Sequence, residues 1–148
     1  MKLNEEFFNR DALDVAPDLV GKIIARKLDD GTILRERIAE TEVYRGEEDL
    51  GCHASKGRTK RTEILYGESG IIYVYLCYGM HWLMNVITGE REQPQGVLFR
   101  CGTLKNGPAK LTKYLQVRVN RFCFYEREES SFICLSGTVF LRGAALRF

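Results

Sequence analysis

The stretch KIIARKLDDGTILRERIAETEVY, residues 22–44, decides the fold. Two runs with β-branched residues flank Asp29-Asp30-Gly31, and an Asp-Gly pair between such runs is a strong signal for a β-hairpin turn. The sequence therefore predicts an antiparallel hairpin whose second strand reaches Tyr44.

Two carboxylates lie on one face of that second strand. Side chains alternate with a period of two, which predicts Ile38, Glu40, Glu42 and Tyr44 on one face and residues 39, 41 and 43 on the other. A face with two carboxylates is ordinarily the solvent side. A carboxylate and a tyrosine two residues apart can also form the acidic end of an aromatic pocket. The alternation alone leaves both interpretations open.

The rest of the chain predicts short elements around this hairpin. Residues 11–20 indicate a short helix with Asp11 as its N-cap and Gly21 at its end. Further strands are predicted at residues 71–77, 81–88 and 96–102, with a helical turn at 62–65 and a short helix opened by Pro108. Residues 130–143 are compatible with a strand pair. The polar, glycine-rich connection over residues 45–70 has a length that is usually functional or disordered.

Composition excludes several classes of protein. The 148 residues suit one domain, and a net charge of +2 alone does not indicate a nucleic-acid binder. Five cysteines, odd in number and without a CxxC pair, indicate a reducing compartment, and Cys52-His53 has no second pair for a metal site. The acidic start MKLNEEFF differs from a signal peptide, and the longest apolar run is too short for a membrane span. We expect an intracellular protein without a metal or a membrane segment.

Cations and aromatic residues surround the long connection. The run KGRTKR, residues 56–61, is either a solvated loop or a phosphate-binding one, and its composition leaves this open. The next strand carries Tyr73 and Tyr75 on one face, and Tyr78-Gly79 then breaks the alternation, which predicts a bend that points Tyr78 elsewhere. Aromatic faces beside cations suit the stacking of nucleobases.

Several motifs occur together in order. AETEVYRGEEDLGCHASKGRTKRTEILYG, YVYLCYGMHWLMNV and GVLFR resemble the alkylpurine (3-methyladenine) DNA glycosylases of the human alkyladenine glycosylase type, over about residues 5 to 116. The resemblance implies a single α+β domain over residues 1–148, built as a curved, mostly antiparallel sheet with short peripheral helices. The chain departs from the family in having only CGTLKN between Arg100 and Gly107, where relatives have a longer segment.

The resemblance also assigns residues to roles. The acid that activates the attacking water is Glu42, expected at the floor of an aromatic cleft. Residues of the base-binding pocket are Tyr44, His53, Tyr75, Asn85 and Arg100. The residues at the point of insertion into the duplex are Tyr78 and, beside it, Met80. Cations for the phosphate backbone are Lys56, Arg58, Lys60 and Arg61. Tyr73 is expected to be a core residue.

The resemblance implies a monofunctional enzyme of base excision repair. It would flip an alkylated purine out of double-stranded DNA and hydrolyse the N-glycosidic bond of 3-methyladenine, 7-methylguanine and, as a neutral base, hypoxanthine. No cofactor is expected, and the enzyme would act as a monomer inside the cell, with the DNA. The alternatives are a nucleic-acid-binding module of the same fold that has lost catalysis, and a structural or protein-interaction domain.

Overall fold

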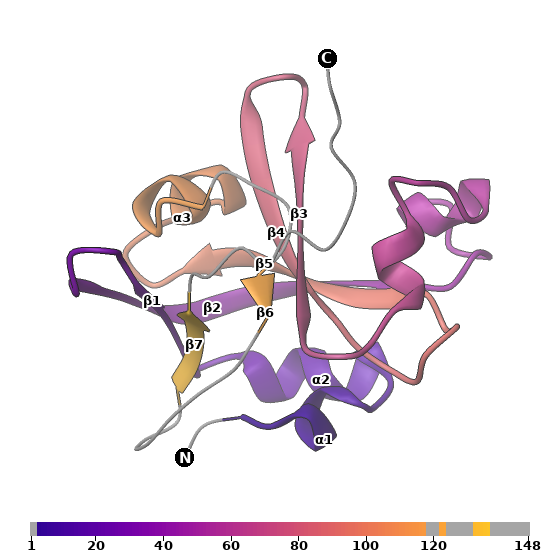
Figure 1. Cartoon of the computed structure of the whole chain (residues 1–148), viewed down its shortest axis with the longest axis horizontal. Coiled ribbons are helices and arrows are strands. Elements are labelled where there is room, and N and C mark those ends of the chain that lie inside the picture. Colours follow the sequence, from indigo (N-terminus) through magenta and orange to yellow (C-terminus); the bar gives the residue numbers. More distant parts are fainter. Residues whose placement is uncertain (1–2, 118–121, 124–131, 137–148) are drawn as a thin grey trace.

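The computed structural model describes residues 3–117, 122–123 and 132–136, and it has the predicted α+β fold (Figure 1). Within these residues, seven strands form one curved sheet in the order β6-β3-β4-β5-β2-β1-β7. All neighbouring pairs are antiparallel except β1 and β7. The strands are β1 (Ile23–Lys27), β2 (Ile33–Arg45), β3 (Ile71–Cys77), β4 (His81–Ile87), β5 (Gln95–Gly102), β6 (Phe122–Cys123) and β7 (Phe132–Ser136).

Short helices surround this sheet. They are α1 (Glu5–Phe8), α2 (Ala12–Leu19), α3 (Pro108–Tyr114) and the 3-10 turns η1 (His53–Lys56) and η2 (Glu63–Tyr66). The predicted cap of α2 is confirmed, because the Asp11 side chain accepts a hydrogen bond from the backbone N–H of Leu13. Among the described residues, no helix has both the length and the apolar character to cross a membrane.

The hairpin of β1 and β2 is confirmed in detail. Asp29, Asp30 and Gly31 form the connection between Leu28 and Thr32, and the N–H of Leu28 donates to the carbonyl of Thr32 at 2.8 Å. Gly31 has φ +84°, the left-handed conformation that such a connection requires at its last residue. Asp30 Oδ1 accepts from the Thr32 N–H at 2.8 Å, so the turn residues themselves hold the reversal.

A β-bulge in β2 changes which side chains share a face. Ile38 pairs with Gly102 but Glu40 pairs with Cys101, so Ala39 is an extra residue on the β2 side. Ile38 is therefore buried in the main core, whereas Glu40 and Glu42 are exposed. The prediction that Ile38 shares the face of Glu42 is wrong, because the extra residue reverses the alternation.

The main core lies on one face of the sheet. Alternate residues of β3, β4 and β5 pack there against α1, α2 and α3, and the Thr41 hydroxyl donates to the Ala16 carbonyl at 3.0 Å. Apolar burial at about 25 cal/mol per Å² is the main stabilising contribution of this layer. In Figure 1, α1 and α2 lie together below the sheet, and the β3–β4 hairpin projects from the opposite side.

A second, smaller core folds the long connection onto the other face of the sheet. Its buried members are Cys52, Ala54, Leu65, Tyr66, Tyr73 and Ile87. The connection is therefore packed in place by apolar contacts. Of the predicted strand pair at residues 130–143, only β7 is described, and the remainder lies outside the described residues.

Candidate active site

An aromatic pocket lies on the face of the sheet opposite the main core. It is open to solvent and narrow, with a cavity volume of about 20 Å³. Its lining residues come from the sheet and the long connection: Tyr44, Gly51, Cys52, His53, Leu65, Tyr73, Tyr75, Asn85 and Gly96.

Strand register explains why residues far apart in the sequence meet here. Tyr73 pairs with Asn85, Asn85 with Leu98, and Leu98 with Glu42, so these four side chains form one row across β3, β4, β5 and β2. Paired residues point to the same face of a sheet, and so do residues two apart along a strand. Glu42 therefore shares a face with the pocket residues, and the alternate positions of the same strands build the main core.

Glu42 stands at the edge of this pocket, bound to two of the predicted site residues. The Tyr44 hydroxyl donates to Glu42 Oε1 at 2.7 Å, and Arg100 Nε lies 3.4 Å from Oε2. The Glu42 side chain is 45% exposed, and it reaches the pocket through Tyr44 rather than forming its floor. Leu98, which lies between Glu42 and Asn85 in this row, is 2% exposed.

The surroundings keep the Tyr44 phenol protonated. Burial raises the pKa of Tyr44, and the hydrogen bond to the Glu42 carboxylate raises it further. A protonated phenol can only serve Glu42 as a donor, so one carboxylate oxygen is held in a fixed direction. The second oxygen faces Arg100, which lies at a register shift between β2 and β5.

His53 forms one wall of the pocket. Its Nδ1 lies 3.0 Å from the Tyr73 hydroxyl, and its ring meets the Tyr75 ring edge to face at 4.5 Å between centroids. Burial lowers the pKa of His53, and the positive charges of Arg61 and Lys56 lower it further. The imidazole is therefore neutral at neutral pH.

Tyr73 belongs to this wall as well as to the core. The sequence assigned it to the core alone, and it is indeed 3% exposed, but its hydroxyl reaches His53 and its ring lines the pocket. The signal for this was its alternation with Tyr75 on one face. The centre of the Tyr75 ring lies 5.4 Å from the centre of the Tyr73 ring. Burial raises the pKa of Tyr75 to about 12.

The sequence did not predict four further residues that line the pocket: Gly51, Cys52, Leu65 and Gly96. They reach the pocket only through the strand register and the folding of the long connection.

Asn85 is the buried amide of the pocket. It is 4% exposed, and its Nδ2 donates to the Tyr73 carbonyl at 3.3 Å. That hydrogen bond fixes the amide plane against the neighbouring strand, so the side chain presents a constant shape to the pocket.

The predicted bend at Tyr78 is the turn of the β3–β4 hairpin. The Met80 N–H donates to the Cys77 carbonyl at 3.1 Å, and Tyr78 and Gly79 both have positive φ, 51° and 70°. This is the pattern of a type I′ turn, in which the first position is usually Asn, Asp or Gly. Tyr78 is 90% exposed and Met80 69%, at the free end of the projecting hairpin (Figure 1).

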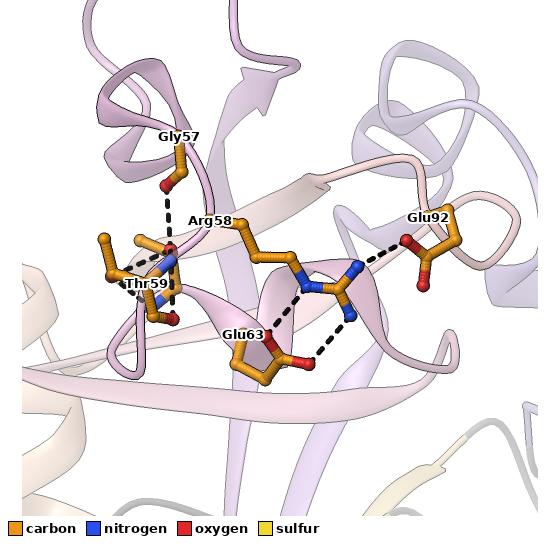
Figure 2. A network of polar contacts seen from close by, with 6 residues as sticks. Gly57, Arg58, Thr59, Glu63 and Glu92 are labelled. Carbon is orange, nitrogen blue, oxygen red and sulfur yellow. Dashed lines mark hydrogen bonds and ion pairs between the residues drawn. The ribbon is translucent and has the colours of Figure 1, made fainter.

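The four predicted phosphate-binding cations differ in their surroundings. Lys56, Lys60 and Arg61 are exposed and form no ion pair with the described residues. Arg61 lies 5.9 Å from the centre of the Tyr75 ring. Arg58 binds two carboxylates, those of Glu63 and Glu92, as Figure 2 shows.

Comparison with known proteins identifies relatives of the chain. Residues 6–105 match the family described as methylpurine-DNA glycosylase. A protein of Natranaerobius thermophilus is 43% identical over 122 residues, 82% of this chain and 61% of the relative. A protein of Psychrobacter cryohalolentis is 48% identical over 120 residues, which are 78% of this chain and 57% of the relative. A protein of Clostridium botulinum is 54% identical over 102 residues, which are 68% of this chain and 50% of the relative. Each is named "Putative 3-methyladenine DNA glycosylase". The chain thus spans between half and about three fifths of the length of these relatives.

Proposed function

Because the chain belongs to the methylpurine-DNA glycosylase family, we propose that it hydrolyses the N-glycosidic bond of alkylated purines in double-stranded DNA. It leaves an abasic site and does not cut the strand. The observation that carries the proposal is the hydrogen bond that joins Glu42 to Tyr44, a wall of the aromatic pocket. Residues 1–148 then act as one glycosylase domain, as a monomer, where the DNA is.

The glycosidic bond of a stacked base is inaccessible, so the nucleotide must first leave the helix. Extrusion costs a few kcal/mol and is cheapest for damaged, poorly paired bases. The proposed wedge is Tyr78, a large exposed ring at the end of a hairpin, with Met80 beside it. Exposed Lys56, Lys60 and Arg61 supply the contacts to the phosphate backbone, and such contacts position the duplex without reading its sequence.

The pocket then selects a cationic purine. Alkylation at N3 or N7 makes the base positive, and stacking on Tyr44 and Tyr75 gains a cation–π contribution of roughly 0.5–2 kcal/mol that normal bases lack. The lowered pKa of His53 supports this selection, since a neutral imidazole does not repel a cationic base. The fixed, buried amide of Asn85 disfavours unmodified guanine through its exocyclic amine.

Glu42 supplies the chemistry. Its carboxylate deprotonates a water aimed at the sugar C1′ and offsets the positive charge of the oxocarbenium-like transition state. Tyr44 and Arg100 orient the two carboxylate oxygens. A cationic purine leaves without a proton, so one carboxylate suffices where sugar hydrolases ordinarily use two. Hypoxanthine is neutral and must be protonated as it leaves.

The test is excision from duplex DNA that carries 3-methyladenine, 7-methylguanine or hypoxanthine, followed by alkali to reveal abasic sites. We expect the wild-type chain to release the alkylated bases and Glu42→Gln to release none. The matched control is Glu40→Gln, which changes a second exposed carboxylate two residues away and is expected to keep wild-type activity.

A second candidate is a binding module of the same fold. The observation in its favour is that Glu42 is 45% exposed beside the pocket, whose aromatic lining could stack bases without it. Selective binding of duplexes with alkylated purines, with no base released by the wild-type chain, would establish this candidate and reject the enzyme.

A further inference from the structure

Arg58 is the centre of a polar network at the surface of the long connection. Its Nε and Nη2 donate to the two oxygens of Glu63 at 2.8 and 2.7 Å, and its Nη1 donates to Glu92 at 2.5 Å (Figure 2). Its guanidinium also lies 4.9 Å from the centre of the Tyr66 ring. A bidentate pair, a second carboxylate and an aromatic face together fix the guanidinium in position and orientation.

These contacts join two connections between strands. Arg58 and Glu63 lie in the connection between β2 and β3, and Glu92 lies between β4 and β5. The Glu92 N–H donates to the Tyr66 carbonyl at 3.0 Å, and the Tyr66 hydroxyl donates to Glu47, just beyond the end of β2, at 2.5 Å. Glu92 has φ 70°, an uncommon value for a residue other than glycine, and these contacts hold it there.

Both joined connections lead to residues that line the aromatic pocket. His53 lies between Glu47 and Arg58 in the chain, so the network holds its segment from both sides. Glu92 precedes β5, whose Gly96 also lines the pocket. The turn between Gly57 and Thr62 is itself rigid, because buried Thr62 donates to the Gly57 carbonyl at 3.0 Å and accepts from the Thr59 N–H at 2.7 Å.

Electrostatics sets Arg58 apart from the other cations of its run. One guanidinium between two carboxylates leaves a local charge of −1, which repels a phosphate. We propose that Arg58 is a positioning residue that fixes the spacing of the pocket walls for the proposed base excision, and that it is not a phosphate contact. The inference rests on the proposed function for its effect on excision. The claim that Arg58 holds the two connections together does not depend on that function.

The experiment compares Arg58→Ala, Arg58→Lys, the double variant Glu63→Gln/Glu92→Gln and, as a phosphate-contact control, Lys60→Ala in the full chain. Amide hydrogen exchange over residues 51–66 is measured together with single-turnover excision and the salt dependence of DNA binding. We expect exchange at least tenfold faster and excision about tenfold slower in the first three variants. Exposed ion pairs add little to global stability, so Tm should fall by less than about 4 °C.

The variants separate positioning from phosphate binding. Lysine keeps the charge but not the forked donors, so a positioning role predicts that Arg58→Lys behaves like Arg58→Ala. The slope of log K for DNA binding against log salt concentration should stay unchanged in Arg58→Ala and Arg58→Lys. In Lys60→Ala its magnitude should decrease by about 0.9, because one phosphate contact is lost. A reduced slope in Arg58→Ala would overturn the proposal. Unchanged exchange in the Arg58 variants would also overturn it, even if the wild-type chain released no base and the proposed function failed.

Discussion

The hydroxyl of Tyr44 donates a hydrogen bond of 2.7 Å to the carboxylate of Glu42, two residues earlier on the same strand. Strand alternation puts both side chains on the pocket face, and their separation lets the phenol reach back to the acid. One side chain is therefore both a wall of the pocket and a fixed donor to the Glu42 carboxylate. Under the proposed function, this hydrogen bond joins base binding to the catalytic acid.

Tyr44→Phe should slow base excision and leave base stacking intact. The ring remains, but Glu42 loses a donor, and a hydrogen bond to a charged, partly exposed group is worth about 1 kcal/mol. We expect a three- to tenfold lower single-turnover rate with little change in the binding of damaged DNA. Tyr114→Phe is the control, because it removes a hydroxyl that donates to the Arg35 carbonyl outside the pocket. An equal loss in both variants would contradict the role of the Tyr44 hydroxyl.

His53 should make the protein less stable in acid. Its pKa is lowered on folding, so below the unfolded value of about 6.5 the unfolded chain binds more protons than the native one. The stability present above that pH is lost as the pH falls through the folded pKa. We expect His53→Gln to lose less unfolding free energy than wild type between pH 7.5 and pH 5 in urea titrations. His81→Gln changes the exposed histidine of β4 and serves as the control. Parallel losses in wild type and His53→Gln would reject this linkage.

Tyr78→Asn should stabilise the fold and impair excision. A residue other than glycine at φ 51° is strained, and Asn-Gly is the preferred pair for a type I′ turn. The Tyr78 ring is 90% exposed, so its removal sacrifices little packing. We expect a gain of roughly 0.5–1 kcal/mol in urea unfolding, with a loss of most excision activity. Full activity in this variant would show that the ring is not the wedge.

Glu36 should contribute to stability through its hydrogen bonds. It is 3% exposed, and Oε1 accepts from the Thr103 hydroxyl at 3.0 Å and from the Leu104 N–H at 3.1 Å. Glu36→Ala leaves these donors without an acceptor and should cost roughly 1–3 kcal/mol in chemical denaturation. Glu36→Gln keeps an acceptor oxygen and should stay within about 1 kcal/mol of wild type. A loss in Glu36→Gln as large as that in Glu36→Ala would assign the effect to the charge instead. Glu40→Ala, at an exposed position of the same strand, is the neutral reference.

Short-range sequence signals predicted several of the local conformations in the fold. The Asp30-Gly31 pair predicted the β1–β2 hairpin, and Asp11 predicted the start of α2, because turn and cap conformations depend on a few neighbouring residues. The break at Tyr78-Gly79 likewise predicted a change of direction. The alternation in β2 predicted the pairing of Glu42 with Tyr44. It failed for Ile38, because a bulge depends on how β2 meets β5, and nothing within β2 encodes it.

The sequence by itself therefore determined the local conformations, the set of aromatic and acidic side chains and the family to which the chain belongs. Only the tertiary structure decided which of those side chains meet. The row from Tyr73 to Glu42, the contact of His53 with Tyr73, and the carboxylate partners of Arg58 all join segments that are distant in the chain. Such contacts depend on strand register and loop packing, which are set by burial across the whole sheet. A one-residue shift would send every side chain of a strand to the other face.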